Sequence, residues 1–128
     1  MRLRELEARF YRRTMEERTR MFQREDGSVE EVTGPCEVYV PVETLAEADG
    51  VQFLCPLCFQ ANGGRAGTHM VLCWFTDKVP DDAVPGPGRW NPAGTGLDDL
   101  TFVPPGAFSV QVIGGCGWHG FVKNGEAE

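Results

Sequence analysis

The chain has 128 residues, 41% of them hydrophobic, and a formal net charge of −7. This length supports one hydrophobic core, so the sequence predicts a single domain spanning residues 1–128. The N-terminus is charged throughout, and no segment has the apolar length of a signal peptide or a membrane span, which predicts an intracellular protein with no membrane partner. The five cysteines are odd in number, so metal ligands or free thiols are favoured over a disulfide framework.

The N-terminal segment carries most of the positive charge. Residues 1–24 contain eight arginines and four glutamates, whereas the rest of the chain contains four basic and fifteen acidic residues. This division predicts a basic arm that contacts an acidic surface, on this protein, on a second copy or on a protein partner. Nucleic acid is the less favoured partner, because no basic groove rich in aromatic residues accompanies the arm. The spacing of Leu3, Leu6 and Phe10 allows a short helix within the arm.

The segment that follows has the pattern of a β-hairpin. Residues 18–32 contain an Asp-Gly pair, the favoured two-residue turn, between two stretches that can pair as strands. Residues 36–42 read CEVYVPV, whose β-branched and aromatic side chains predict a strand.

Short strands and turns dominate the rest of the chain. Residues 44–50 fit one capped helical turn, because a threonine precedes a glutamate by three positions. Residues 79–99 form a long loop, which either lines a binding site or packs on the surface through Trp90. The predicted fold class is mainly β, small α+β at most, with a β-rich body over residues 36–126. The best strand patterns lie at residues 51–54, 69–75, 100–103, 108–113 and 121–124.

Two pairs of candidate metal ligands occur in the chain. Cys55 and Cys58 are three positions apart in CPLC, and Cys116 and His119 have the same spacing in CGWH. Each pair adjoins a predicted strand, so the two turns resemble the paired knuckles of a zinc ribbon. Three thiolates and one imidazole form a common tetrahedral zinc shell. The sequence therefore predicts one structural zinc ion bound by Cys55, Cys58, Cys116 and His119.

A competing zinc shell combines Cys55 and Cys58 with His69 and Cys73. This shell requires His69 and Cys73 to lie one turn apart on a helix. If residues 69–75 form a strand, the two side chains are about 13 Å apart and cannot share an ion. The strand pattern therefore favours the first shell, and we expect no ligand role for His69, Cys73 or Cys36.

The same motifs support an enzymatic function less well than they support a structural zinc site. The strand leading into Cys55-Pro-x-Cys58 resembles the redox site of glutaredoxins, where a helix N-terminus lowers the thiol pKa. Two adjacent glycines, Gly63 and Gly64, argue against a helix there. A zinc deaminase would require a His-x-Glu motif, which the chain lacks.

Several blocks of the chain resemble a family of small uncharacterised proteins encoded in tailed bacteriophages and prophages of proteobacteria. The resemblance covers about residues 44–126, and its most specific block is GRWNPAGTGLDDLTF; the others are TLAEADGVQFLCPLCF, GTHMVLCWF and GGCGWHGFVKNGE. It implies a phage product made in the bacterial cytoplasm. It supplies no activity and no catalytic residue.

These observations predict a zinc-binding accessory or interaction protein that engages a host or phage macromolecule through its arm or its long loop. In this hypothesis the zinc is structural and no residue is catalytic. One alternative is a structural virion protein that decorates or joins the particle. A second alternative is a zinc-dependent hydrolase with an incompletely filled metal site.

Overall fold

A computed structural model describes all 128 residues and confirms the predicted mainly β fold class. The strands form three antiparallel sheets, with the orders β2-β1-β3-β4, β5-β6 and β7-β8-β9. Two short helices interrupt the strands. The bounds are β1 Arg9–Gln23, β2 Val29–Val42, the 3-10 helix η1 Leu45–Glu47, β3 Gly50–Leu54, α1 Pro56–Asn62, β4 Met70–Trp74, β5 Asn91–Ala93, β6 Thr101–Val103, β7 Ser109–Gln111, β8 His119–Lys123 and β9 Glu126–Ala127.

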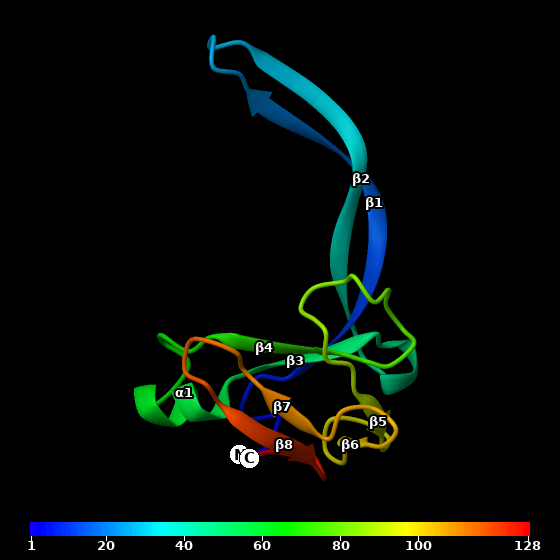
Figure 1. The fold of residues 1–128 in the computed structure, drawn as a ribbon, viewed down its shortest axis with the longest axis vertical. Coiled ribbons are helices and arrows are strands. Elements are labelled where there is room, and N and C mark those ends of the chain that lie inside the picture. Colours follow the sequence, from blue (N-terminus) through cyan, green and yellow to red (C-terminus); the bar gives the residue numbers. More distant parts are fainter.

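A long hairpin of β1 and β2 stands out from a compact body (Figure 1). The two strands pair along their whole length, from Phe10 opposite Val42 to Gln23 opposite Val29. The N–H of Gly27 donates to the carbonyl of Arg24 at 2.9 Å, and Gly27 has a φ of 86°. A type I turn followed by a left-handed glycine is the common three-residue hairpin loop. The N–H of Arg24 also donates to the carbonyl of Ser28 at 2.8 Å, so the loop consists of residues 25–27. The predicted hairpin is confirmed, with a loop one residue longer than expected.

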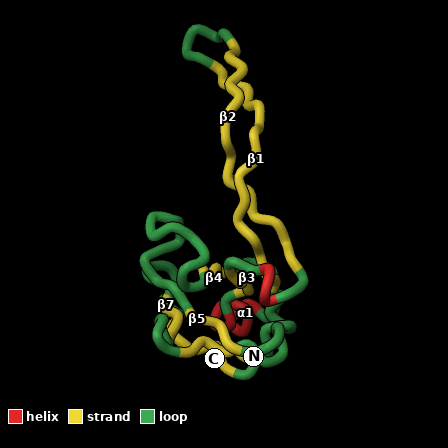
Figure 2. Tube along the Cα trace, turned by 90° about the vertical axis from the view of Figure 1, so that its right-hand side faces the viewer, coloured by secondary structure: helices red, strands yellow, loops and turns green.

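The first eight residues belong to the body and not to a projecting arm. Leu3 and Leu6 are fully buried, although residues 3–7 form a turn and not the short helix that their spacing allows. The N-terminal amine donates to the carbonyl of Ala127 at 2.9 Å, and Figure 2 shows the two termini side by side, away from the hairpin. The spacing of the apolar residues therefore identified the buried side chains correctly, although they are buried by an irregular turn and not by a helix.

Five of the eight arginines in residues 1–24 form ion pairs with acidic side chains of the same chain. Arg13 forms an ion pair with Glu37 at 2.7 Å and Arg24 with Glu30 at 2.9 Å. The guanidinium of Arg13 lowers the pKa of Glu37 through their hydrogen bond. The hairpin of residues 9–42 contains six arginines and seven acidic residues, which are spread over β1, the loop and β2. The hairpin is therefore not basic as a whole.

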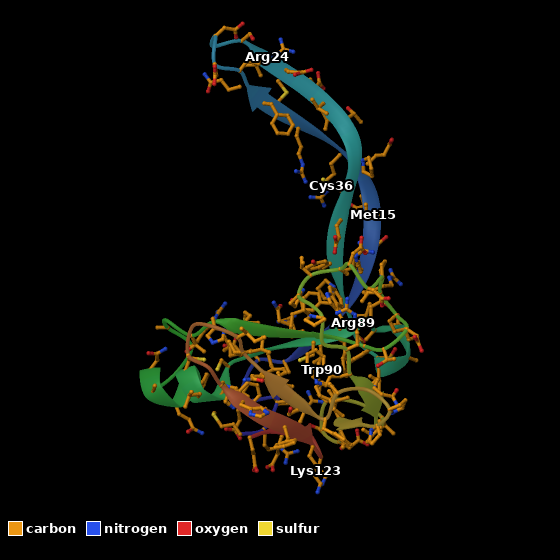
Figure 3. All side chains as sticks on the ribbon, viewed as in Figure 1. Met15, Arg24, Cys36, Arg89, Trp90 and Lys123 are labelled. Atoms are coloured by element: carbon orange, nitrogen blue, oxygen red, sulfur yellow. The ribbon has the colours of Figure 1, made fainter.

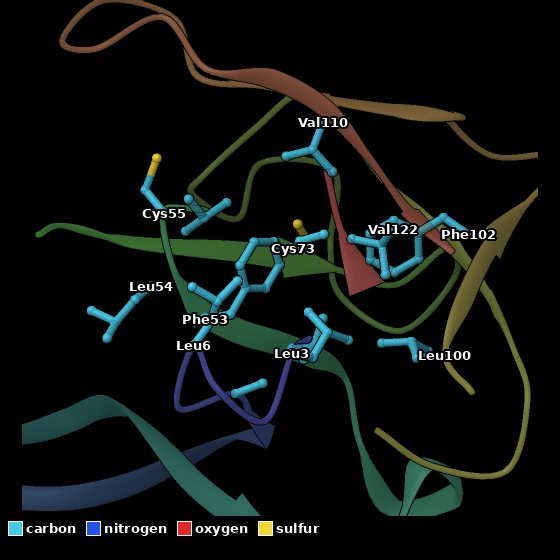
Figure 4. Close-up of a cluster of buried hydrophobic side chains, with 14 of the residues drawn as sticks. Leu3, Leu6, Phe53, Leu54, Cys55, Cys73, Leu100, Phe102, Val110 and Val122 are labelled. Carbon is cyan, nitrogen blue, oxygen red and sulfur yellow. The ribbon is translucent and has the colours of Figure 1, made fainter. Parts of the chain in front are cut away.

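The core of the body is built around β3 and β4. Phe53 and Cys73 are fully buried between the N-terminal turn and the sheet of β7, β8 and β9 (Figure 4). Val51 is fully buried in the same core cluster. A Cβ at Gly50 would lie 2.6 Å from the ring of Trp74, so glycine allows β3 to lie close to that ring. The body thus closes around the end of β3, which leads directly into Cys55.

The long loop predicted over residues 79–99 is interrupted by strand β5, which pairs with β6, and the part before this strand packs around Arg89. Its guanidinium donates to the backbone carbonyls of Pro80, Ala83 and Gly88 at 2.8 to 3.0 Å. The Trp90 indole donates to the carbonyl of Ser109 at 2.9 Å, as the packed-loop interpretation expects. Figure 3 labels both side chains in the body. The loop is therefore held as a packed surface loop by one charged group and one indole.

Replacing Arg89 with alanine is expected to lower the free energy of unfolding by about 2 kcal/mol, because several loop carbonyls lose a charged donor. Residues 80–88 should also become sensitive to protease. Chemical denaturation and limited proteolysis measure both effects. The control is Arg65→Ala, because Arg65 is exposed and has a single 3.8 Å contact with Glu7. Equal stability and equal protease resistance in the two variants would show that Arg89 does not hold the loop.

Candidate metal centre

Four side chains gather at one end of the body. The ligand atoms of Cys55, Cys58, His69 and Cys116 all lie within 4.8 Å of one another. The sulfur of Cys116 is 3.7 Å from that of Cys55 and 3.3 Å from Nε2 of His69. Three sulfurs and one imidazole at these separations are positioned to hold a metal ion.

The first two ligands come from the junction between β3 and α1. Cys55 is fully buried and is the residue before the helix, and Pro56 occupies the first helical position. Proline is favoured there because the position needs no N–H donor. The N–H of Phe59 donates to the carbonyl of Cys55 at 2.9 Å, which closes the first helical turn. This turn brings the side chain of Cys58 to the same side as that of Cys55.

Strand pairing places His69 beside Cys55. In the β3–β4 ladder Leu54 lies opposite Met70. The N–H of Cys55 donates to the carbonyl of His69 at 2.9 Å, so the pairing continues one residue beyond the strands. His69 is therefore positioned by the register of the central sheet.

Cys116 reaches the site from the loop between β7 and β8. Gly114, Gly115 and Gly117 surround it, and their φ angles of 80°, 54° and 68° lie in the left-handed region that favours glycine. The N–H of Gly117 donates to the carbonyl of Gly114 at 3.2 Å, which closes a tight turn. The unusual glycine content of GCGWHG thus serves to fold Cys116 over the end of β3.

The predicted ligand set is corrected at one position, because His119 lies outside the group. His119 begins β8 opposite Gln111, is exposed and stacks on Phe121 with ring centroids 6.4 Å apart. Successive side chains of a strand point to opposite faces, so Trp118 enters the core and His119 points outward. His69 takes the place expected for His119. The second pair of ligands therefore does not act as a zinc-ribbon knuckle.

The competing shell of Cys55, Cys58, His69 and Cys73 contains the histidine that joins the group, but its fourth member, Cys73, does not join it. Cys73 lies within strand β4 opposite Val51 and is fully buried, and burial raises the pKa of its thiol. It is not part of the group. His69 joins Cys116 in the group, a combination that neither predicted shell contained. The missed signal is the antiparallel register of residues 51–54 with 69–75, which sets residue 69 opposite residue 55.

The three thiols of the group differ in pKa. The Trp118 N–H and the His69 ring lower the pKa of Cys116 to about 6. Burial, together with the sulfurs of Cys116 and Cys55, raises the pKa of Cys58 to about 11, and burial likewise raises the pKa of Cys55. Cys116 is therefore the most acidic of the three thiols. A bound divalent cation would stabilise all three sulfurs as thiolates.

The helix expected to be absent after Cys55 is present. Helix α1 ends before the two glycines, and Gly63 caps it in the left-handed conformation with a φ of 68°. The glycines therefore end the helix and do not prevent it. In a redox enzyme the helix N-terminus lowers the pKa of the attacking thiol, whereas burial raises the pKa of Cys55. This shift disfavours a thiolate nucleophile at Cys55.

No protein-family model, curated protein or solved structure matches this chain. Neither helix has the length and apolar character needed to cross a membrane. The function must therefore be inferred from the side chains of this chain alone.

Proposed function

We propose that this protein is a zinc-stabilised interaction module, in which a structural zinc ion fixes the body and the long hairpin is presented for binding. The observation that carries the proposal is the gathering of Cys55, Cys58, His69 and Cys116 from three separate segments of the chain. The bacteriophage source implied by the sequence blocks is part of the same proposal.

The donor set and its spacing support zinc. In a tetrahedral zinc site with Zn–S bonds of about 2.3 Å, neighbouring sulfurs are about 3.8 Å apart. The 3.7 Å between the sulfurs of Cys55 and Cys116 matches this edge. Oxygen ligands, which calcium and magnesium prefer, are missing from the group.

The arrangement supports a structural role in preference to hydrolysis. Four protein ligands fill a tetrahedral shell, whereas catalytic zinc sites keep one position for water. Cys55 belongs to the main core cluster, so the ligands join the core to the outer loop that carries Cys116. The zinc would hold together elements that pair poorly by themselves, because β7 and β8 are short.

The hairpin is the part of the molecule best suited to contact a partner. It extends away from the body, and several of its large apolar side chains are exposed (Figure 3). Exposed apolar groups of this kind mark protein interaction surfaces when they gather on one element. These side chains are Met15, Met21, Phe22, Val29, Val32 and Tyr39.

A cobalt substitution test separates the two histidines. We expect His69→Ala to reduce metal affinity by at least tenfold and to change the absorption bands of tetrahedral Co²⁺, because one of four ligands is lost. His119→Ala is the matched control and should keep both the affinity and the spectrum. Metal content by elemental analysis gives an independent reading. A spectrum that depends on His119 and not on His69 would contradict the site.

A further inference from the structure

One edge of the hairpin has no partner along most of its length. Strand β1 pairs with β3 only over Arg9–Tyr11. Next to this contact the N–H of Asp49 donates to the carbonyl of Tyr11, and the N–H of Arg13 donates to the carboxylate of Asp49, both at 2.8 Å. Odd-numbered residues of β1 therefore direct their backbone groups away from β2. From Met15 to Gln23 these outward N–H and C=O groups meet no strand of the chain.

The opposite edge of the hairpin is blocked. On β2 the odd-numbered residues face outward in the same way, and two of them, Pro35 and Pro41, have no N–H to donate. Proline on an outer strand is a recognised protection against pairing with another chain. Strand β1 has no proline between Arg9 and Gln23. The hairpin is thus protected on one edge and open on the other.

The hairpin also exposes apolar side chains along the open edge. Met15 is 53% exposed and Met21 is 65% exposed. A two-stranded ribbon is only marginally stable by itself in water, whereas four strands form a stable sheet. The open edge therefore has both the backbone groups and the side chains to gain from a further strand.

We propose that the open edge of β1 pairs antiparallel with β1 of a second copy of this chain, forming a four-stranded sheet across a two-fold axis. The inference rests on the proposed role of the hairpin as a binding element. The outward N–H of Arg13 already donates to Asp49, so the free edge runs from Met15 to Gln23. A ladder centred on Arg18 sets Met15 of one copy opposite Met21 of the other.

The charges favour this pairing. The same register sets Glu16 of each copy opposite Arg20 of the other, which gives two ion pairs across the ladder. The two Arg18 side chains meet at the centre, where each is already paired with Glu16 of its own chain at 3.1 Å. Glu16, Glu17, Arg18 and Arg20 together are neutral, so the central edge carries no net charge.

The antiparallel arrangement also separates the two acidic bodies. The hairpin of residues 9–42 holds six arginines and seven acidic residues, so most of the net charge of −7 lies on the body. The seven paired residues from Met15 to Met21, at about 3.4 Å each, span roughly 24 Å. This length exceeds the Debye length of about 8 Å in physiological salt, so repulsion between the bodies is screened.

The test uses two threonines that lie opposite each other on the hairpin. Thr19 on β1 and Thr33 on β2 both direct their N–H outward, and their hydroxyls share one hydrogen bond of 2.8 Å. Thr19→Pro removes a donor from the open edge, whereas Thr33→Pro removes one from the protected edge. Both variants lose the same hydroxyl pair, so each is the matched control of the other.

Sedimentation equilibrium of the zinc-loaded protein between about 1 and 100 μM is the measurement. We expect the wild type and Thr33→Pro to reach twice the chain mass of 14.1 kDa. Thr19→Pro should weaken association by about 30-fold or more, because two symmetry-related hydrogen bonds are lost. The Glu16→Arg variant should also weaken association, and Arg20→Glu added to it should restore it.

Every other result overturns the inference. A wild type that stays monomeric at 100 μM, or two proline variants that associate equally well, excludes pairing through β1. A monomer whose open edge binds a poly-glutamate peptide would assign the edge to an acidic strand instead. Zinc content is measured on the same samples: a monomer with one zinc per chain contradicts only this inference, and a dimer without zinc contradicts only the proposed function.

Discussion

Replacing Cys55 with serine is expected to abolish stoichiometric zinc binding and to unfold the body of the protein. Cys55 is the buried ligand, and it joins the core to three other donors. The 46 residues between His69 and Cys116 contain most of the body strands, and closing such a loop costs about 3 to 4 kcal/mol. A structural zinc ion contributes about 10 to 16 kcal/mol of apparent binding free energy. Since net stability is only about 5 to 15 kcal/mol, loss of the ion leaves little margin.

Thermal melts in reductant, with and without a strong chelator, measure this effect. The control is Cys36→Ser, because Cys36 lies on the hairpin outside the metal group and should keep both the zinc and the melting temperature. Lower pH should act like the chelator, because protons compete with zinc for the thiolates and the imidazole. A cooperative transition that is unchanged after verified zinc removal would show that the hydrophobic core holds the fold alone.

The N-terminal turn is expected to contribute as much as the strands to the stability of the body. Leu6→Ala should lower the free energy of unfolding by about 2 to 5 kcal/mol, because Leu6 is fully buried and its loss leaves a cavity. Deleting residues 1–8 should prevent folding, since Leu3 is lost as well. Urea denaturation of the zinc-loaded protein measures the change.

Leu57→Ala serves as the control for this prediction. Leu57 is 46% exposed on α1, so its truncation should cost about 0.5 kcal/mol or less. Equal stability of the two variants would place residues 1–8 outside the core, in the arm that the charge pattern alone suggested.

Local patterns predicted the elements well because their causes are local. The hairpin follows from an Asp-Gly turn between β-favouring stretches, and the capped turn at residues 44–50 is present, with the N–H of Glu47 donating to the Thr44 hydroxyl at 3.3 Å. Cysteine spacing in CPLC likewise indicated two ligands that a single helical turn brings together. Such features depend on residues within a few positions of one another.

The sequence by itself determined the mainly β class, the hairpin and the three cysteines of the candidate metal site, because turn chemistry and ligand spacing act over short distances. Only the tertiary structure decided between the two histidines. His119 is three residues from a ligand but points outward with its strand, whereas His69 is eleven residues from Cys58 and lies opposite Cys55. That choice depends on strand register, which is set by the packing of β3 against β4 across the whole core and is not a property of either segment alone.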